Sequence, residues 1–112
     1  MDYWSGLDAL VSAHRIVIDR PKGSRRKVSR DEVFPFDYGY LEGTVSGDGA
    51  EVDVWVGSLP CKIITGVICT VDLLKGDVET KLLVGCTGVE AETALRCHNF
   101  GQQHGILVKR PM

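Results

Sequence analysis

Short runs of alternating apolar and polar residues, separated by glycines, constrain the fold of this chain more than any other feature of its sequence. Thirteen glycines are spread along the 112 residues. Residues 51–56 alternate most clearly, because their sequence EVDVWV has a valine at every second position. A period of two is the pattern of a strand that buries one face, and glycines between such runs mark tight turns. The sequence therefore predicts a fold built mainly of short strands.

The other strands are expected in segments bounded by similar turn signals. They cover residues 15–20, 34–45, 61–74, 78–86 and 106–110. In the strand over residues 51–56, the valines are expected to face the core and Trp55 to face outward. Gly66 marks an expected bulge in the long fourth segment. Strands of unequal length with a helix late in the chain predict a small, curled antiparallel barrel of about five strands.

Two short helices complete the expected fold. The first covers residues 5–14, with Ser5 as its N-cap. The second begins after Thr87, because Thr87 and Glu90 have the spacing of a capping box. The inner side of the second helix is expected to carry Ala91, Ala94, Leu95 and His98.

Size and composition predict one ordinary domain over residues 1–112. Hydrophobic residues make up 44% and charged residues 25% of the chain, as in globular proteins. The net charge of -2 argues against a protein that binds nucleic acid through a basic surface. The sequence has no signal peptide and no apolar run that would span a membrane, so a cytoplasmic protein with four reduced cysteines is expected.

Charged residues gather at the ends of the predicted strands. The acidic ones are Asp19, Asp48, Asp53, Asp77 and Glu79. Lys81 lies on the same side of its strand as Glu79, and residues 22–27 form a basic loop. Carboxylates at one mouth of a barrel repel one another unless cations neutralise them, and Mg²⁺ is the usual cation for oxygen ligands. Basic residues beside such a site suit a phosphate. This pattern favours metal-assisted phosphoryl transfer.

Simpler interpretations of the same residues stay open. Residues 46–53 read equally as a polar turn followed by a half-exposed strand, and residues 75–81 as a solvated hairpin with paired charges. The basic loop reads equally as a solubilising surface. A zinc site at Cys97, His98 and His104 is disfavoured, because their spacing matches no standard zinc motif.

Four motifs, in order along the chain, resemble the soluble, Mg²⁺-dependent inorganic pyrophosphatases. They are IVIDRP at residues 16–21, FPFDYGY at 34–40, DGAEVDV at 48–54 and KGDVETK at 75–81. The third motif corresponds to the acidic signature of that family, D-x-D-[P or E]-x-D followed by an apolar residue. The resemblance covers residues 16–86, which is most of the chain.

The resemblance implies a five-stranded barrel of OB type with flanking helices, and hydrolysis of inorganic pyrophosphate to two phosphates with Mg²⁺ as cofactor. By similarity, the metal ligands are Asp48, Asp53, Asp77 and Glu79. Asp53, Lys81 and Tyr38 are the expected catalytic residues, and Lys81 and Tyr38 also contact phosphate. Asp19 is expected to hydrogen-bond the hydrated site. Members of this family commonly form homo-oligomers.

Several departures from the family pattern lie in or near these motifs. Ala50 stands where the signature has its middle carboxylate, and Phe34 stands where an aromatic hydroxyl is usual. The loop before Phe34 is short. Its basic residues, expected to replace lost substrate contacts, are Lys22, Arg25, Arg26 and Arg30. A tyrosine-lysine pair that grips the outer phosphate in the family has no counterpart near His98.

These departures leave several functions in competition. The first is a pyrophosphatase, with a rate reduced by the loss of the middle carboxylate. The second is a non-catalytic relative that keeps metal or phosphate binding, and the third is a hydrolase of another phosphoanhydride or a phosphate ester. An OB-type nucleic-acid binder, with Tyr38, Tyr40 and Trp55 as stacking platforms, is opposed by the acidic strand ends.

Overall fold

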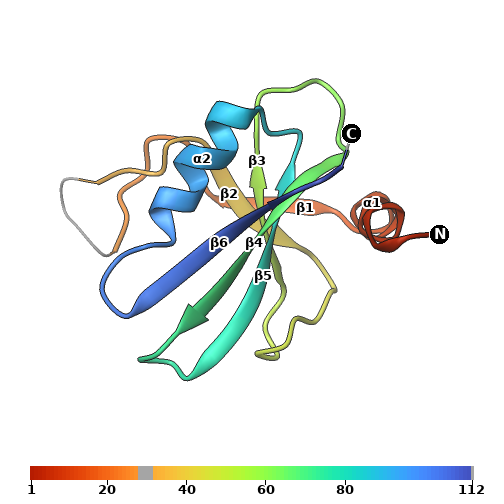
Figure 1. Ribbon diagram of the computed structural model, residues 1–112. Coiled ribbons are helices and arrows are strands. Elements are labelled where there is room, and N and C mark those ends of the chain that lie inside the picture. Colours follow the sequence, from red (N-terminus) through yellow and green to blue (C-terminus); the bar gives the residue numbers. More distant parts are fainter. Residues whose placement is uncertain (28–31, 112) are drawn as a thin grey trace.

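The computed structural model describes residues 1–27 and 32–111. In this part of the chain it has two helices and six strands (Figure 1). The helices are α1 (Tyr3–Ala13) and α2 (Gly88–Cys97). The strands are β1 (Ile16–Arg20), β2 (Asp37–Leu41), β3 (Val52–Val56), β4 (Ile64–Asp72), β5 (Asp77–Val84) and β6 (Gln103–Lys109). The expected β-rich class is confirmed. None of the helices described is long and apolar enough to cross a membrane.

The six strands form one mixed sheet in the order β1-β2-β3-β5-β4-β6. Every neighbouring pair is antiparallel except β3 and β5, which are parallel. The parallel pair arises because β5 returns from β4 through a tight turn and lies between β4 and β3. The expected five-stranded, wholly antiparallel barrel is not confirmed, since β6 adds a sixth strand on the outer edge of β4 and the sheet keeps β1 and β6 as its edges.

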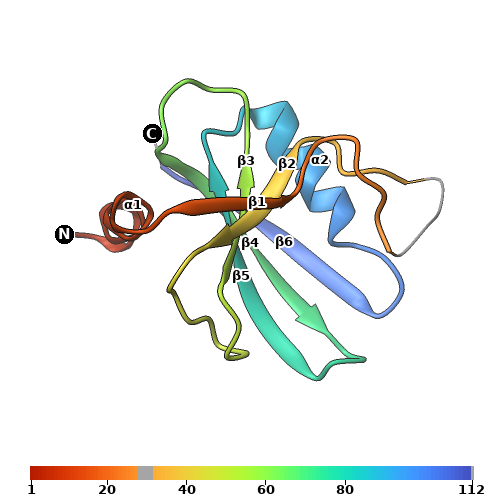
Figure 2. The same cartoon turned by 180° about the vertical axis from the view of Figure 1, so that it is seen from behind.

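The twisted sheet has a core on each of its faces, and Figures 1 and 2 show α1 and α2 far apart on opposite sides of it. The core beside α1 contains Val11, Leu41, Val54, Ile64, Val67, Leu82 and Val84. The core beside α2 contains Phe36, Trp55, Ile68, Leu83, Cys86, Ala91, Ala94 and Cys97. Each of the two cores is therefore bordered by one helix.

Trp55 is the main correction to the expected side-chain orientations. The sequence pattern predicts that it faces outward, and this is wrong, because Trp55 is only 1% exposed. It does lie on the face of β3 opposite Val54, as alternation requires. That face is covered by α2 and by Phe36, whose ring centroid is 5.0 Å from that of Trp55.

The helix boundaries agree with the sequence in one case and differ in the other. The capping box at α2 is confirmed, since the side chains of Thr87 and Glu90 each accept a bond from the other's backbone N–H. For α1, the expected N-cap Ser5 is wrong. Asp2 caps the helix instead, and its Oδ1 accepts a hydrogen bond from the Ser5 N–H at 2.8 Å.

Two further local expectations are confirmed, while some strand bounds differ. The strand expected at residues 34–45 covers only Asp37–Leu41, and the last strand begins at Gln103 instead of Ile106. The register of β4 and β5 shifts between Ile64 and Gly66, which confirms the bulge. All four cysteines are free thiols. Gly39 allows β1 to cross β2 closely, because a Cβ at this position would come 1.8 Å from the carbonyl oxygen of Val17.

Candidate metal and phosphate site

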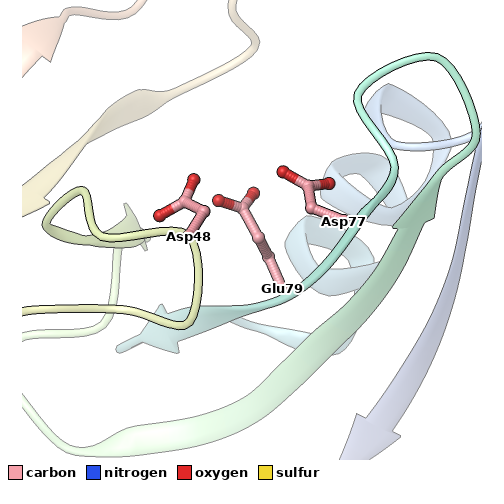
Figure 3. A group of neighbouring side chains, drawn as sticks. All are labelled: Asp48, Asp77 and Glu79. Atoms are coloured by element: carbon pink, nitrogen blue, oxygen red, sulfur yellow. The ribbon is translucent and has the colours of Figure 1, made fainter.

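Three of the predicted metal ligands lie together at one end of the sheet. Asp48 comes from the turn before β3, and Asp77 and Glu79 come from the start of β5. Figure 3 shows the three carboxylates pointing toward one another, with Glu79 in the middle. One ligand oxygen from each lies within 4.8 Å of the others. The structure thus brings residues from two separate motifs into one group of oxygen donors.

The turn at residues 46–50 holds Asp48 in place. The backbone N–H of Ser46 donates to the carbonyl oxygen of Ala50 at 2.7 Å, which closes the turn. Gly49 has a φ of 85°, a conformation that favours glycine. Asp48 Oδ1 accepts hydrogen bonds from the Ala50 N–H at 2.9 Å and from the Ser46 hydroxyl. The carboxylate is therefore oriented by its own turn and reaches Glu79 across the gap.

The pKa values of Asp48 and Glu79 are shifted in opposite directions. A hydrogen bond with Glu79, together with those from Ser46 and Ala50, lowers the pKa of Asp48 well below its usual range. Burial, with a further contribution from Asp48, raises the pKa of Glu79. Two carboxylates this close do not both ionise without cost, so they are expected to share a proton unless a cation replaces it.

Lys81 is a buried ammonium held by two carboxylates. Its Nζ lies 2.6 Å from Asp53 Oδ2 and 2.6 Å from Glu79 Oε2. The parallel pairing of β3 and β5 explains the contact, because Val54 pairs with Leu82 and the preceding residues of the two strands are Asp53 and Lys81. Burial acts to lower the pKa of Lys81, but the nearby acidic groups outweigh it and raise that pKa above its ordinary value.

Tyr38 forms an aromatic wall beside Lys81. Its ring centroid is 4.7 Å from that of Trp55 and 5.5 Å from that of Phe34. Burial raises the pKa of Tyr38 far above its usual value, and Lys81 and Asp53 lie close enough to act on the same hydroxyl. The Tyr38 hydroxyl therefore stays protonated at neutral pH and can donate a hydrogen bond.

The other two predicted acidic residues lie outside the group of three carboxylates. Asp53 is half-buried and is bound to Lys81, which links it to Glu79 through the ammonium. Asp19 is exposed on β1, where the register with β2 shifts between Ile18 and Arg20. Asp19 thus lies on the edge strand β1, which β2 separates from β3 and β5, and is not among the clustered carboxylates.

The predicted substrate-binding residues of the basic loop are spread over different environments. Lys22 is exposed, and its backbone N–H donates to Asp37 Oδ1 at 2.9 Å. Arg25 is exposed and pairs with Val33 through its backbone. Arg26 donates to the carbonyl oxygen of Cys97 at 2.6 Å, at the end of α2. Arg30 lies outside the described residues.

The guanidinium of Arg26 makes its contacts within the protein. It lies between the rings of Phe34 and Phe100, at 5.7 Å and 5.4 Å from their centroids. Its side chain is 11% exposed and also pairs with Glu32. Arg26 therefore joins the basic loop to the end of α2, and Phe34 separates it from Tyr38.

The sequence places His98 on the inner face of the second helix and indicates no hydrogen-bond partner for it. In the structure His98 is 7% exposed and accepts a hydrogen bond from the Trp55 indole N–H at 3.0 Å. Burial lowers the pKa of His98 to about 4, so it is neutral near pH 7. Trp55 and His98 are 43 residues apart in the sequence, and no local pattern relates them. Among the described residues, the group of side chains that could hold a metal ion is the acidic one.

A cavity of about 710 Å³ lies between α1 and the strands β4 to β6. Its lining is mainly apolar, including Leu7, Leu10 and Ile106, and it reaches Glu79 at one side. It offers no lysine or arginine to a phosphate. The group that can bind a cation and a phosphate is therefore the acidic one with Lys81, and not this cavity.

Comparison with known proteins identifies no relative of this chain: no family model matches it, and searches of curated proteins and of solved structures return no match.

Proposed function

We propose that this protein is a Mg²⁺-dependent inorganic pyrophosphatase that acts at the carboxylates of Asp48, Asp77 and Glu79. The observation that carries the proposal is the convergence of these three carboxylates beside the buried ammonium of Lys81. Each comes from a motif that resembles the pyrophosphatases. Oxygen ligands next to a fixed positive charge suit a substrate that is both metal-bound and anionic.

The strand order supports the same relationship at the level of the fold. An OB-type fold is a five-stranded, partly open Greek-key barrel. Strands β1 to β5 lie in the order β1-β2-β3-β5-β4, so β3 and β5 are neighbours although β4 lies between them in the sequence. We propose that these five strands correspond to that barrel and that β6 is an addition to its edge.

The three carboxylates fit a magnesium ion. Mg²⁺ binds oxygen at about 2.1 Å in octahedral geometry, so two ligand oxygens on opposite sides of the ion are about 4.2 Å apart. The ligand oxygens of Asp48, Asp77 and Glu79 lie within 4.8 Å of one another. Neighbouring ligands of an octahedral ion are about 3.0 Å apart, so the side chains would have to move by up to about 2 Å to bind one ion together. Removing the proton shared by Asp48 and Glu79 would accompany binding.

A bound Mg²⁺ and the residues around the carboxylates would have different roles in hydrolysis. A bound Mg²⁺ would supply positive charge for the phosphate oxygens and acidify a coordinated water. Lys81 offers its ammonium to phosphate charge and keeps Asp53 and Glu79 apart. Tyr38 stays protonated and donates a hydrogen bond to a phosphate oxygen. Because Ala50 provides no carboxylate to activate the attacking water, the proposed rate is lower than that of the family.

A second candidate function is metal and phosphate binding without hydrolysis. Two observations favour it. Ala50 lacks the middle carboxylate, and Arg26, one of the basic residues that could compensate, is bound to the end of α2. Such a protein would keep the cation site and bind pyrophosphate without releasing phosphate. Hydrolysis of another phosphoanhydride stays a third candidate.

The test is phosphate release from pyrophosphate with and without Mg²⁺. We expect Mg²⁺-dependent turnover by the wild type, and at least about a 100-fold loss in Asp77→Asn and Glu79→Gln, since both remove a metal ligand. Glu92→Gln is the matched control, because Glu92 is an exposed acid on α2. Each variant is first checked for folding by circular dichroism.

The outcomes separate the three candidates. Turnover that survives both substitutions would contradict the assignment of these carboxylates. Pyrophosphate that binds with Mg²⁺ but is not hydrolysed would favour the binding protein. Phosphate release from other phosphoanhydrides alone would favour the third candidate.

A further inference from the structure

A chain of hydrogen bonds crosses the core from β3 to the turn between β4 and β5. The Trp55 indole N–H donates to His98 Nε2 at 3.0 Å. His98 Nδ1 lies 2.9 Å from Gln103 Oε1, and Gln103 Nε2 donates to Asp72 Oδ2 at 3.3 Å. These four residues come from β3, the end of α2, β6 and β4, so the chain joins elements that are far apart in the sequence.

The direction of each hydrogen bond determines the next one. An indole N–H only donates, so His98 Nε2 is the acceptor and Nδ1 carries the proton of the neutral ring. Nδ1 then donates to the amide oxygen of Gln103, which turns the amide nitrogen toward Asp72. His98 and Gln103 therefore each accept on one side and donate on the other, and His98 is the member that meets Trp55.

One end of this chain is the aromatic wall beside Lys81, and the other is the turn that precedes Asp77. At one end, the Trp55 ring packs against Tyr38 with 4.7 Å between centroids. At the other end, Asp72 Oδ1 accepts hydrogen bonds from the backbone N–H groups of Leu74 and Lys75, at 3.0 Å and 2.9 Å. Asp72 is the register partner of Asp77, one of the clustered carboxylates.

Gly105 on β6 leaves room for His98, because glycine has no side chain. A Cβ at Gly105 would come 3.3 Å from His98 Cβ and 3.3 Å from Ile68 Cγ2. The imidazole is thus confined by its hydrogen bonds and by close packing. It is a rigid spacer between Trp55 and the strand that begins at Gln103.

We propose that His98 is a positioning residue: through Gln103 and Asp72 it fixes the β4–β5 turn, and with it the carboxylate of Asp77, relative to the wall formed by Tyr38 and Trp55. This proposal rests on the proposed function, in which Asp77 is a metal ligand and Tyr38 contacts phosphate. The linkage itself depends only on the hydrogen bonds and packing described above.

The test compares His98→Leu, which removes both hydrogen bonds, with His98→Gln, whose amide can accept from Trp55 and donate to Gln103. Gln103→Met interrupts the chain at a half-buried position and covers the case in which His98→Leu fails to fold. His14→Gln is the control, because His14 is a hydrogen-bonded histidine at the end of α1. Amide hydrogen exchange and the Trp55 indole N–H resonance are recorded by NMR without metal, and the Kd for Mn²⁺ is measured by titration.

We expect faster exchange at the Leu74 and Lys75 amides and a shifted Trp55 resonance in His98→Leu. Gln103→Met should likewise speed exchange at the two amides. Loss of such supporting contacts typically weakens metal binding about 10-fold or more, so the Kd for Mn²⁺ should rise by about that factor in both variants. His98→Gln should stay within about twofold of the wild type, and exchange at the Ile64 amide, on the α1 side, should not change.

Two results would overturn the proposal. One is wild-type exchange at Leu74 and Lys75 in both His98→Leu and Gln103→Met. The other is uniformly faster exchange that includes Ile64, which would indicate a purely structural role. Failure of the proposed function has a different signature, because the wild type itself would then bind no Mn²⁺ and release no phosphate, while the exchange data would still decide the linkage.

Discussion

Ala50 is the single residue at which the candidate site differs most from the acidic signature it resembles. It is exposed in the turn that carries Asp48, and its backbone N–H donates to the Asp48 carboxylate at 2.9 Å. A carboxylate at this position would therefore lie next to the clustered oxygen donors. Its absence removes a group that could position or deprotonate the attacking water.

Ala50→Asp is expected to raise the rate of pyrophosphate hydrolysis. Loss of a general base typically costs about 10²–10⁴-fold, so restoring it should give a gain of at least about 10-fold in kcat at saturating Mg²⁺. Ala50→Asn is the control, because it has the same size and hydrogen-bonding reach without the charge. Equal rates for the Asp and Asn variants would show that Ala50 does not limit the reaction.

His98 gives a prediction about pH. Its pKa is lowered to about 4, first by burial and then by the charges of Lys81 and Arg26, against the opposing effects of Gln103 and Asp53. The unfolded chain has an ordinary histidine with a pKa near 6.5. Between these values the unfolded state binds a proton that the folded state does not, so the free energy of unfolding falls as pH falls from about 6.5 to 4.

Chemical denaturation of the wild type and of His98→Gln at several pH values measures this effect. The wild type should lose on the order of 2 kcal/mol more than His98→Gln between pH 7 and pH 4.5. His14 and His104 are present in both proteins, so their contributions cancel. Parallel pH profiles would contradict the neutral, buried state of His98.

At the scale of elements, the parallel pairing of β3 and β5 accounts for the charge arrangement of the site. It brings Asp53 and Lys81, which lie 28 residues apart, to 2.6 Å. Lys81 and Glu79 are almost buried, with side chains 8% and 10% exposed. Removing the ammonium would leave the two carboxylates without a neutralising cation in a partly dry environment.

Lys81→Met is therefore expected to lower the free energy of unfolding by about 2–4 kcal/mol, since removing one partner of a buried ion pair is costly. Methionine keeps the apolar stem and removes only the charge. Lys75→Met is the matched control: its pair with Asp77 spans 3.7 Å and its side chain is 58% exposed, so the loss should be under about 1 kcal/mol. A similar small loss in both variants, measured by urea denaturation, would contradict the account of Lys81.

The sequence predicts a feature of an element where residues close together in the sequence determine it, and fails where distant residues do. The start of α2 is local, because Thr87 and Glu90 cap the same turn, and it was predicted correctly. The start of α1 was not, since the helix begins at Tyr3 and is capped by Asp2, whose side chain accepts from the Ser5 N–H. Strand neighbours are non-local, so the pattern predicts the last strand but neither its pairing with β4 nor the parallel pair of β3 and β5.

At the scale of the whole molecule, the fold brings together the residues of the candidate site from motifs that are far apart in the sequence. The acidic residues of the turn and of β5 were predicted together, because acids at strand ends meet at one edge of a sheet. The environments of Trp55 and Arg26 were not predicted. Both depend on α2, which lies late in the sequence and covers one face of the sheet, burying Trp55 and giving Arg26 a carbonyl oxygen to bind.

The most direct test of the account is a crystal structure with Mn²⁺ and methylene diphosphonate, a pyrophosphate analogue that is not hydrolysed. The account predicts an anomalous peak for Mn²⁺ within about 2.0–2.4 Å of carboxylate oxygens of Asp48, Asp77 and Glu79, with the diphosphonate on the same ion and facing Lys81 and Tyr38. Crystals in which Mn²⁺ and the diphosphonate bind elsewhere, or in which these carboxylates hold no ion, would contradict it.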